Sequence, residues 1–79
     1  MVKPLQIQAD WDDEAMVWIA ISDDVPGLAT EAETLEQLIE KLKSMVPELL
    51  ALNGYPADGE TAVPFEVVAK RASATLRRI

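Results

Sequence analysis

Residues 34–50 have the sequence TLEQLIEKLKSMVPELL, and this stretch predicts the main helix of the fold. Thr34 is a favourable N-cap, and Gln37 completes a capping box that satisfies backbone donors at a helix start. Apolar side chains recur at helical spacing at Leu35, Leu38, Ile39, Leu42, Val46, Leu49 and Leu50. Because this apolar stripe continues past Pro47, we expect a kink there rather than a break, with Asn53-Gly54 ending the helix.

Three strands are predicted before this helix. Residues 5–11 alternate apolar and polar side chains, as in a strand with one wet face. After an acidic turn at residues 12–14, residues 16–21 are apolar at both odd and even positions. We therefore expect both faces of this strand to be covered. The two strands are predicted to form a hairpin. Residues 23–27 have turn composition, and residues 28–32 are a short third strand.

The chain after the helix predicts one more strand. Residues 55–62 have loop composition, and residues 63–69 favour a strand with Pro64 near its start. Residues 70–79 are compatible with an extension of this strand or with a short basic helix. The resulting βββαβ order predicts an α+β fold with one main helix packed on a mixed sheet, in which the fourth strand returns parallel to the first.

Length and composition narrow the function. The chain has 79 residues, so residues 1–79 are expected to form a single domain. It contains no Cys and no His, which excludes disulfides, thiol nucleophiles and zinc sites of the Cys/His type. No stretch has the apolar length of a signal peptide or of a membrane span, so a cytoplasmic protein without a membrane partner is expected.

The charge is unevenly distributed along the chain. The formal net charge is −7, and all 14 acidic residues lie between Asp10 and Glu66. Four of the seven basic residues lie in the last ten positions: Lys70, Arg71, Arg77 and Arg78. Since an acidic body repels phosphates and attracts cations, we expect a basic partner and no direct nucleic-acid binding, although surplus charge also serves solubility alone.

One face of the sheet is expected to lack cover, because a single long helix covers only one face. On the second strand the uncovered side chains are either Met16 and Trp18 or Val17 and Ile21. Uncovered apolar patches commonly mark association sites, and Trp and Met are enriched at interface cores. We therefore predict a homo-oligomer, a dimer or larger, with candidate interface residues Met16, Trp18, Ala20 and Trp11. In the alternative interpretation Trp11 and Trp18 are core residues. Under both interpretations the two rings can contact each other across the hairpin.

The sequence offers few agents for catalysis. The remaining candidates are carboxylates: Asp10, Asp12, Asp13 and Glu14 near the hairpin, and Asp23 and Asp24 near the next turn. Carboxylates are the ligands of hard cations, but solvated turn residues are the simpler interpretation of these positions. We expect no enzymatic activity, no cofactor and no metal.

The ordered motifs of the first two thirds of the chain resemble those of HicB-like antitoxins. They are the hairpin Trp11-Asp12-Asp13-Glu14, the turn Asp24-Val25-Pro26-Gly27-Leu28 and, within the helix, Pro47-Glu48-Leu49-Leu50. The resemblance covers residues 5–70, and is greatest to a small branch described only as a domain of unknown function. It implies a partial RNase H-like fold of βββαβ order that binds a small HicA-type toxin, an mRNA interferase, and masks its RNA-cleaving surface.

One departure and two alternatives accompany this resemblance. HicB-like antitoxins usually continue into a DNA-binding segment. Residues 1–79 leave no room for one, so we expect no such segment here and no autoregulation by this chain alone. The first alternative is an orphan homo-oligomeric domain without a toxin partner. The second is a remnant of a metal-dependent nuclease that uses Asp10 with Asp12 or Asp23.

Overall fold

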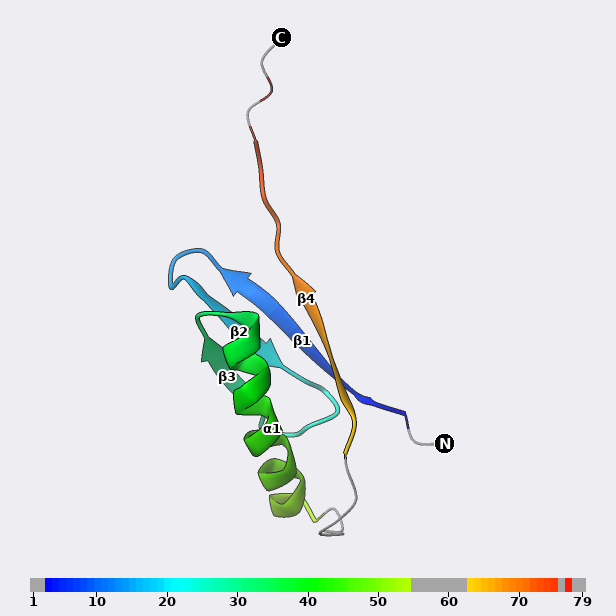
Figure 1. Ribbon diagram of the computed structural model, residues 1–79. Helices are drawn as coiled ribbons and strands as arrows, with labels where there is room; N and C mark the ends of the chain where they lie inside the picture. Colours follow the sequence, from blue (N-terminus) through cyan, green and yellow to red (C-terminus); the bar gives the residue numbers. More distant parts are fainter. Residues whose placement is uncertain (1–2, 55–62, 76, 78–79) are drawn as a thin grey trace.

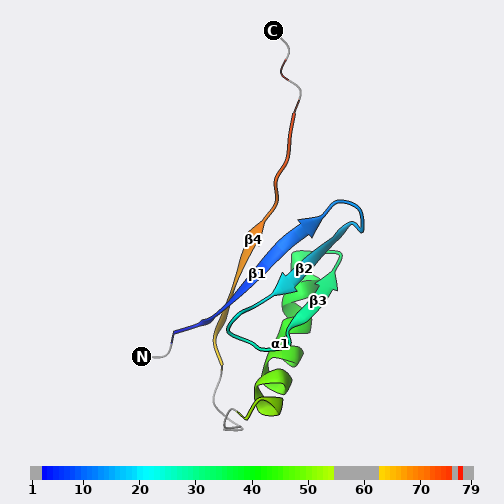
Figure 2. The ribbon, with the colours of Figure 1, turned by 180° about the vertical axis from the view of Figure 1, so that it is seen from behind.

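The computed structural model describes residues 3–54, 63–75 and 77. One helix packs on a four-stranded mixed sheet with the strand order β3-β2-β1-β4 (Figures 1 and 2). The elements are β1 Leu5–Asp12, β2 Val17–Ile21, β3 Ala29–Ala32, α1 Leu35–Leu52 and β4 Phe65–Lys70. The α+β fold of βββαβ order predicted from the sequence is confirmed.

Helix α1 begins and ends where the sequence predicts. The side-chain hydroxyl of Thr34 accepts a hydrogen bond from the backbone N–H of Gln37 at 3.1 Å, which is the N-terminal cap. The helix continues through Pro47, which is exposed, so the proline does not end the element. At the other end the Asn53 side-chain amide donates to the carbonyl of Leu49 at 2.7 Å, and Gly54 has a φ of +82°. A left-handed glycine after a capped last turn is a common helix stop.

The pairing of the strands places alternate residues on two faces. β1 pairs antiparallel with β2, where Trp11 lies opposite Trp18 and Ala9 opposite Ala20. β1 pairs parallel with β4, where Ile7 lies beside Val67, as the predicted return of the fourth strand requires. Since side chains alternate along a strand, the odd residues of β1 and β4 share one face with the even residues of β2.

The hydrophobic core lies between that face and α1, which contacts β2 and β3. From the strands it takes Ile7, Ala9, Trp18, Ala20 and Ala32, and from the helix Leu38, Leu42, Val46 and Leu50. Val25 and Leu28 of the β2–β3 connection complete it. The four buried helix residues follow the apolar stripe in the sequence, so burial of this stripe fixes α1 on the sheet.

The β2–β3 connection is a tight turn that brings two apolar residues to the core. The backbone N–H of Leu28 donates to the carbonyl of Val25 at 3.1 Å, and Gly27 has a φ of +84°. Proline and then a left-handed glycine at the two central positions are the sequence of a type II turn. The predicted turn at Pro26-Gly27 is therefore confirmed, and it explains how Val25 and Leu28 both reach the core.

Side chains of the same connection extend the pairing of β1 beyond the end of β2. The Ser22 hydroxyl donates to the carbonyl of Gln6 at 2.6 Å, and the Asp24 carboxylate accepts from the N–H of Gln6 at 2.8 Å. The Ser22 oxygen also accepts from the N–H of Val25 at 3.2 Å. These bonds satisfy backbone groups of Gln6 on the side of β1 that faces β2.

The remaining predictions concern the chain after α1. The predicted loop at residues 55–62 lies outside the described residues. The fourth strand begins at Phe65, two residues later than predicted, after Pro64. Residues 71–75 have no regular secondary structure and continue in the direction of β4 beyond the sheet (Figure 1). Over these residues neither the predicted extension of the strand nor the predicted helix is formed.

Candidate functional site

The two tryptophans occupy the helix-side face at the hairpin end of the sheet. Their ring centroids are 5.4 Å apart with an interplanar angle of 64°, an edge-to-face contact. Trp18 is 9% exposed and packs in the core, while Trp11 is half-buried and its indole N–H donates to the Asp13 carboxylate at 2.6 Å. The aromatic contact predicted across the hairpin is therefore present.

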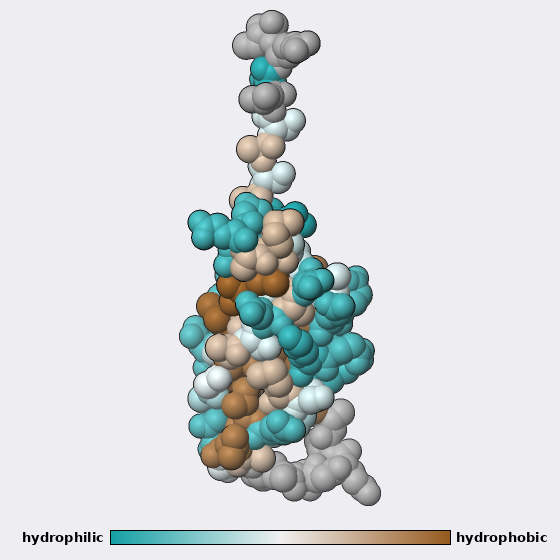
Figure 3. All heavy atoms as spheres, turned by 90° about the vertical axis from the view of Figure 1, so that its left-hand side faces the viewer, coloured by the Kyte–Doolittle hydropathy of each residue, from teal (hydrophilic) through white to brown (hydrophobic). Residues whose placement is uncertain are grey.

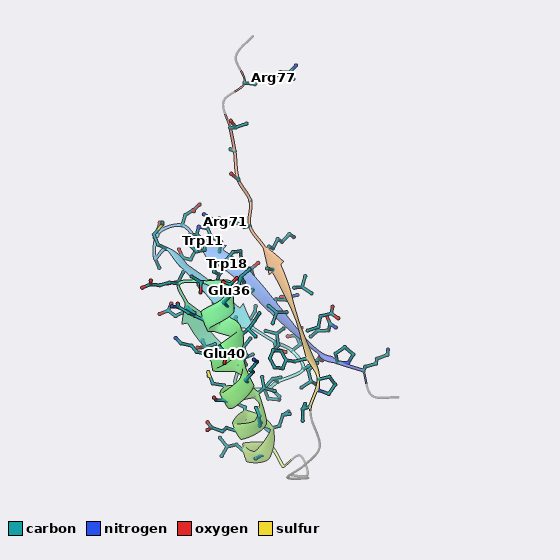
Figure 4. The ribbon with its side chains drawn as sticks, in the orientation of Figure 1. Trp11, Trp18, Glu36, Glu40, Arg71 and Arg77 are labelled. Atoms are coloured by element: carbon teal, nitrogen blue, oxygen red, sulfur yellow. The ribbon has the colours of Figure 1, made fainter. Side chains whose placement is uncertain are left out.

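Arg71 lies over the ring of Trp11. Its guanidinium carbon lies 4.1 Å from the centroid of the Trp11 ring, the geometry of a cation–π contact. Figure 4 shows Arg71, Trp11 and Trp18 together near the start of α1, with Arg77 far along the chain. The basic residue that follows β4 thus holds the start of the tail against the body.

The structure divides the four candidate interface residues between two environments. Trp18 and Ala20 are buried beneath α1, so these two belong to the core of this chain and not to an uncovered face. Trp11 is half-buried on the same side. Met16 is 60% exposed, but it lies in the β1–β2 turn with a φ of +58°. The four residues therefore do not form one exposed patch.

Among the described residues no helix or strand packs on the opposite face of the sheet, and we call it the open face. Its apolar side chains form a row along β2, made of Val17, Ile19 and Ile21, to which β3 adds Ala29 and β4 adds Val68. Ile21 is 46% exposed and Val68 50% exposed. This is the second of the two alternatives that the sequence left open for strand two.

Charged and amide side chains surround this apolar row. On the open face β1 carries Gln6, Gln8, Asp10 and Asp12, β3 carries Glu31, and β4 carries Glu66 and Lys70. Four carboxylates therefore share the face with one ammonium group. A shallow hollow between β1 and β4 is lined by Gln8, Asp10, Val68, Ala69 and Lys70. Figure 3, which views the molecule from the side of β3, shows apolar side chains in a discontinuous strip flanked by hydrophilic ones.

The carboxylates considered as metal ligands lie in two groups at opposite ends of the sheet. Asp12 accepts hydrogen bonds from the N–H groups of Glu14 and Ala15 at 3.0 and 3.2 Å, so it stabilises the hairpin turn. Asp23 lies at the other end of the sheet, beside Asp24, which is bound to Gln6. Gln6 and Asp12 are six positions apart along β1, about 20 Å at the rise of a strand. Within the described residues no three carboxylates group as metal ligands would.

The open face was identifiable from the sequence, through a signal in the hairpin. The odd residues of the first strand are its apolar ones, so they face the core. Asp12 pairs with Val17 across a turn of four residues, which places Trp11 opposite Trp18. Because this turn has an even number of residues, the odd residues of β1 and the even residues of β2 share the inner face. Val17, Ile19 and Ile21 therefore lie on the open face.

No helix in the described part of the chain is long and apolar enough to cross a membrane. The fold and the site together define a small α+β domain with one helix on a mixed sheet and an acidic, partly apolar open face. The chain belongs to the family described as "Domain of unknown function (DUF1902)", which matches residues 4–77.

A solved structure shares this architecture. It is the crystal structure of hypothetical protein TTHA1013 from the extremely thermophilic bacterium Thermus thermophilus. The two chains are 49% identical, the match covers 95% of this chain and 100% of the other, and the TM-score is 0.69. Comparison with curated proteins gave no match.

Proposed function

We propose that this chain is a HicB-like antitoxin domain of the cytoplasm, which neutralises a small basic HicA-type mRNA interferase by binding to it. The proposal assigns the chain no catalytic step and no cofactor. The observation that carries it is the open face, where an apolar row on β2 is bordered by carboxylates and left uncovered by α1. Such a surface suits a partner that combines an apolar contact with positive charge.

The charge distribution supports a basic partner. The open face carries Asp10, Asp12, Glu31 and Glu66, and the chain as a whole has a formal charge of −7. On the outer side of α1, Glu36 and Glu40 add further exposed carboxylates (Figure 4). Acidic surfaces speed the encounter with cationic proteins, and an RNA-cleaving toxin needs a cationic surface to hold its substrate.

The motif resemblance supplies the particular class of partner. The residues that carry it have structural roles here: Trp11 and Asp12 build the hairpin, and Val25 to Leu28 form the turn into β3. They preserve the sheet that presents the open face. The proposal therefore assigns toxin recognition to the side chains of the open face.

The proposal predicts that a small basic protein is encoded beside the gene for this chain, and the test uses that protein, purified, as the candidate toxin. RNA cleavage by that protein is measured against rising concentrations of the chain, and the affinity of the two proteins by calorimetry. We expect wild type to abolish cleavage at a one-to-one ratio. Ile21→Lys should weaken binding by at least about tenfold, since it removes an apolar contact and repels a basic partner.

Leu52→Lys is the matched control, because Leu52 is 82% exposed at the end of α1 and the substitution changes the charge equally. It should leave affinity and inhibition within about twofold of wild type. Unimpeded RNA cleavage in the presence of excess wild-type chain would refute the antitoxin proposal. Equal loss of binding in both Lys variants would show that net charge, and not the open face, governs recognition.

A further inference from the structure

Strand β4 lies at an edge of the sheet and has a single neighbour, β1, among the described strands. Edge strands present unpaired backbone groups that can template pairing with another chain. In β4 these groups can be assigned. The N–H of Leu5 donates to the carbonyl of Pro64 at 3.0 Å, so the even residues of β4 direct their backbone groups toward β1. The outward groups are therefore those of Phe65, Val67 and Ala69.

This edge is suited to accept a strand along its whole length. The missing N–H of Pro64 falls on the side of β1, so the proline does not interrupt the outward row. Beyond Lys70 the chain stays in line with β4 over residues 71–75, which gives a partner strand room to continue (Figures 1 and 2). By contrast β3, at the other edge, is four residues long and is held under α1.

The side chains of β4 select a second copy of this chain in one register. In an antiparallel pair that is symmetric about residue 68, Val68 faces Val68 of the second copy on the open face. Glu66 of each copy then faces Lys70 of the other, which gives two opposite-charge pairs. Val67 faces Ala69 of the second copy, and both direct backbone groups outward, as a hydrogen-bonded pair requires.

Other symmetric registers lack this complementarity. Centring the pair on Lys70 places two ammonium groups opposite each other, and centring it on Glu66 does the same with two carboxylates. Centring it on Val67 or Ala69 leaves both charges without an opposite partner, because Glu66 or Lys70 then faces Val68. We infer that this chain forms a two-fold symmetric dimer through antiparallel pairing of β4 with β4 of a second copy, centred on Val68.

The dimer has a consequence for the open face. A two-fold axis perpendicular to the sheet keeps both open faces on the same side, so the two sheets join into one eight-stranded sheet. The apolar rows of both copies then lie on one continuous surface, with the helices together on the other side. The inference goes beyond the proposed function and does not depend on the existence of a toxin.

Engineered cysteines test the register, because the wild-type chain has none. Val68→Cys places two thiols opposite each other on the axis in a non-hydrogen-bonded pair, where the Cα atoms are about 4.5 Å apart and a disulfide fits. Gln8→Cys is the control, since Gln8 lies beside Val68 on β1 and on the same face. Its two Cα atoms would be three strand spacings apart, about 14 Å, which a disulfide cannot span.

We expect oxidation to convert Val68→Cys into a covalent dimer on a non-reducing gel and to leave Gln8→Cys monomeric on it. Comparable cross-linking of both variants would overturn the register. Light scattering of the wild-type protein should give twice the chain mass of 8.7 kDa. A mass of one chain at every concentration up to about 0.1 mM would overturn the dimer itself. The dimer Kd would then lie above about 0.1 mM, which is weaker than that of most specific complexes.

Charge exchange provides a second test that needs no cysteine. Glu66→Lys places like charges opposite each other twice in each dimer, and should raise the dimer Kd by about tenfold or more. Adding Lys70→Glu to the same chain restores two opposite-charge pairs with reversed sign and should recover most of the loss. Failure of the double variant to recover affinity would contradict the Glu66–Lys70 pairing.

Discussion

The two faces of the sheet both carry apolar side chains, but α1 covers only one of them. On the inner face Ile7, Trp18 and Ala20 are buried between the strands and α1. On the open face Ile19 and Ile21, from the same strand as Trp18, stay half-buried or exposed and lie among carboxylates. The difference shows that apolar residues of one strand can have different surroundings: those on the inner face hold the fold, and those on the open face are left uncovered by α1.

The largest effect expected from this comparison comes from truncating Trp18. Trp18→Ala removes the largest buried side chain of β2 and its edge-to-face contact with Trp11, and should cost about 3–5 kcal/mol in the free energy of unfolding. Ile21→Ala, on the open face of the same strand, should cost less than about 1 kcal/mol. Urea unfolding followed by tryptophan fluorescence or circular dichroism measures both. Equal losses would remove the distinction between the faces.

A smaller effect is expected at the turn that brings Val25 and Leu28 to the inner face. Gly27 has a φ of +84°, and an added Cβ would meet only Leu49 Cδ2 at 3.7 Å, an ordinary contact. Gly27→Ala should therefore cost about 1–2 kcal/mol, from the left-handed backbone alone. Thermal unfolding measures the loss of stability. Gly54→Ala is the comparison, because no atom approaches the added Cβ there and only the cost of the left-handed backbone remains.

The smallest expected effect is a gain in stability from a substitution in the β1–β2 turn, whose length decides which residues of β2 face the core. Met16 has a φ of +58° and is 60% exposed, so it occupies a strained backbone conformation and contributes little burial. Met16→Gly should stabilise the chain by a few tenths to about 1 kcal/mol, because glycine adopts this conformation without the Cβ clash. Destabilisation in urea unfolding would mean that the Met16 side chain packs on the hairpin more than its exposure indicates.

The elements were largely predictable because each depends on local sequence. The helix boundaries follow from the Thr34 cap and the Asn53-Gly54 stop, and the β2–β3 turn follows from Pro26-Gly27. Pro47 is harder to interpret, since a proline removes one hydrogen bond but the apolar stripe holds the helix together across it. Packing therefore decides whether a proline ends a helix, and packing is not a local property.

The candidate interface was less predictable, because it depends on which face of strand two lies under α1. Trp18 was assigned to an interface because Trp is enriched at interface cores, and Ala20 because it shares one side of the strand with Trp18. The structure buries both in the core. Counting residues across the hairpin turn resolves the choice, since pairing of Asp12 with Val17 fixes the parity of the whole strand. The cation–π contact between Arg71 and Trp11 joins residues 60 positions apart in the sequence, and no local pattern indicates it.

The central claim is that the apolar row of the open face is available for binding and does not hold the fold. The most direct test is the free energy of unfolding, in urea at one fixed protein concentration, of the triple variant Val17→Thr, Ile19→Thr and Ile21→Thr. Threonine keeps the β-branched shape and strand preference of these residues while removing apolar surface. The account predicts a cooperative transition within about 2 kcal/mol of wild type, with an unchanged m-value. A loss as large as that of Trp18→Ala would show that this face also stabilises the fold, and would contradict the account.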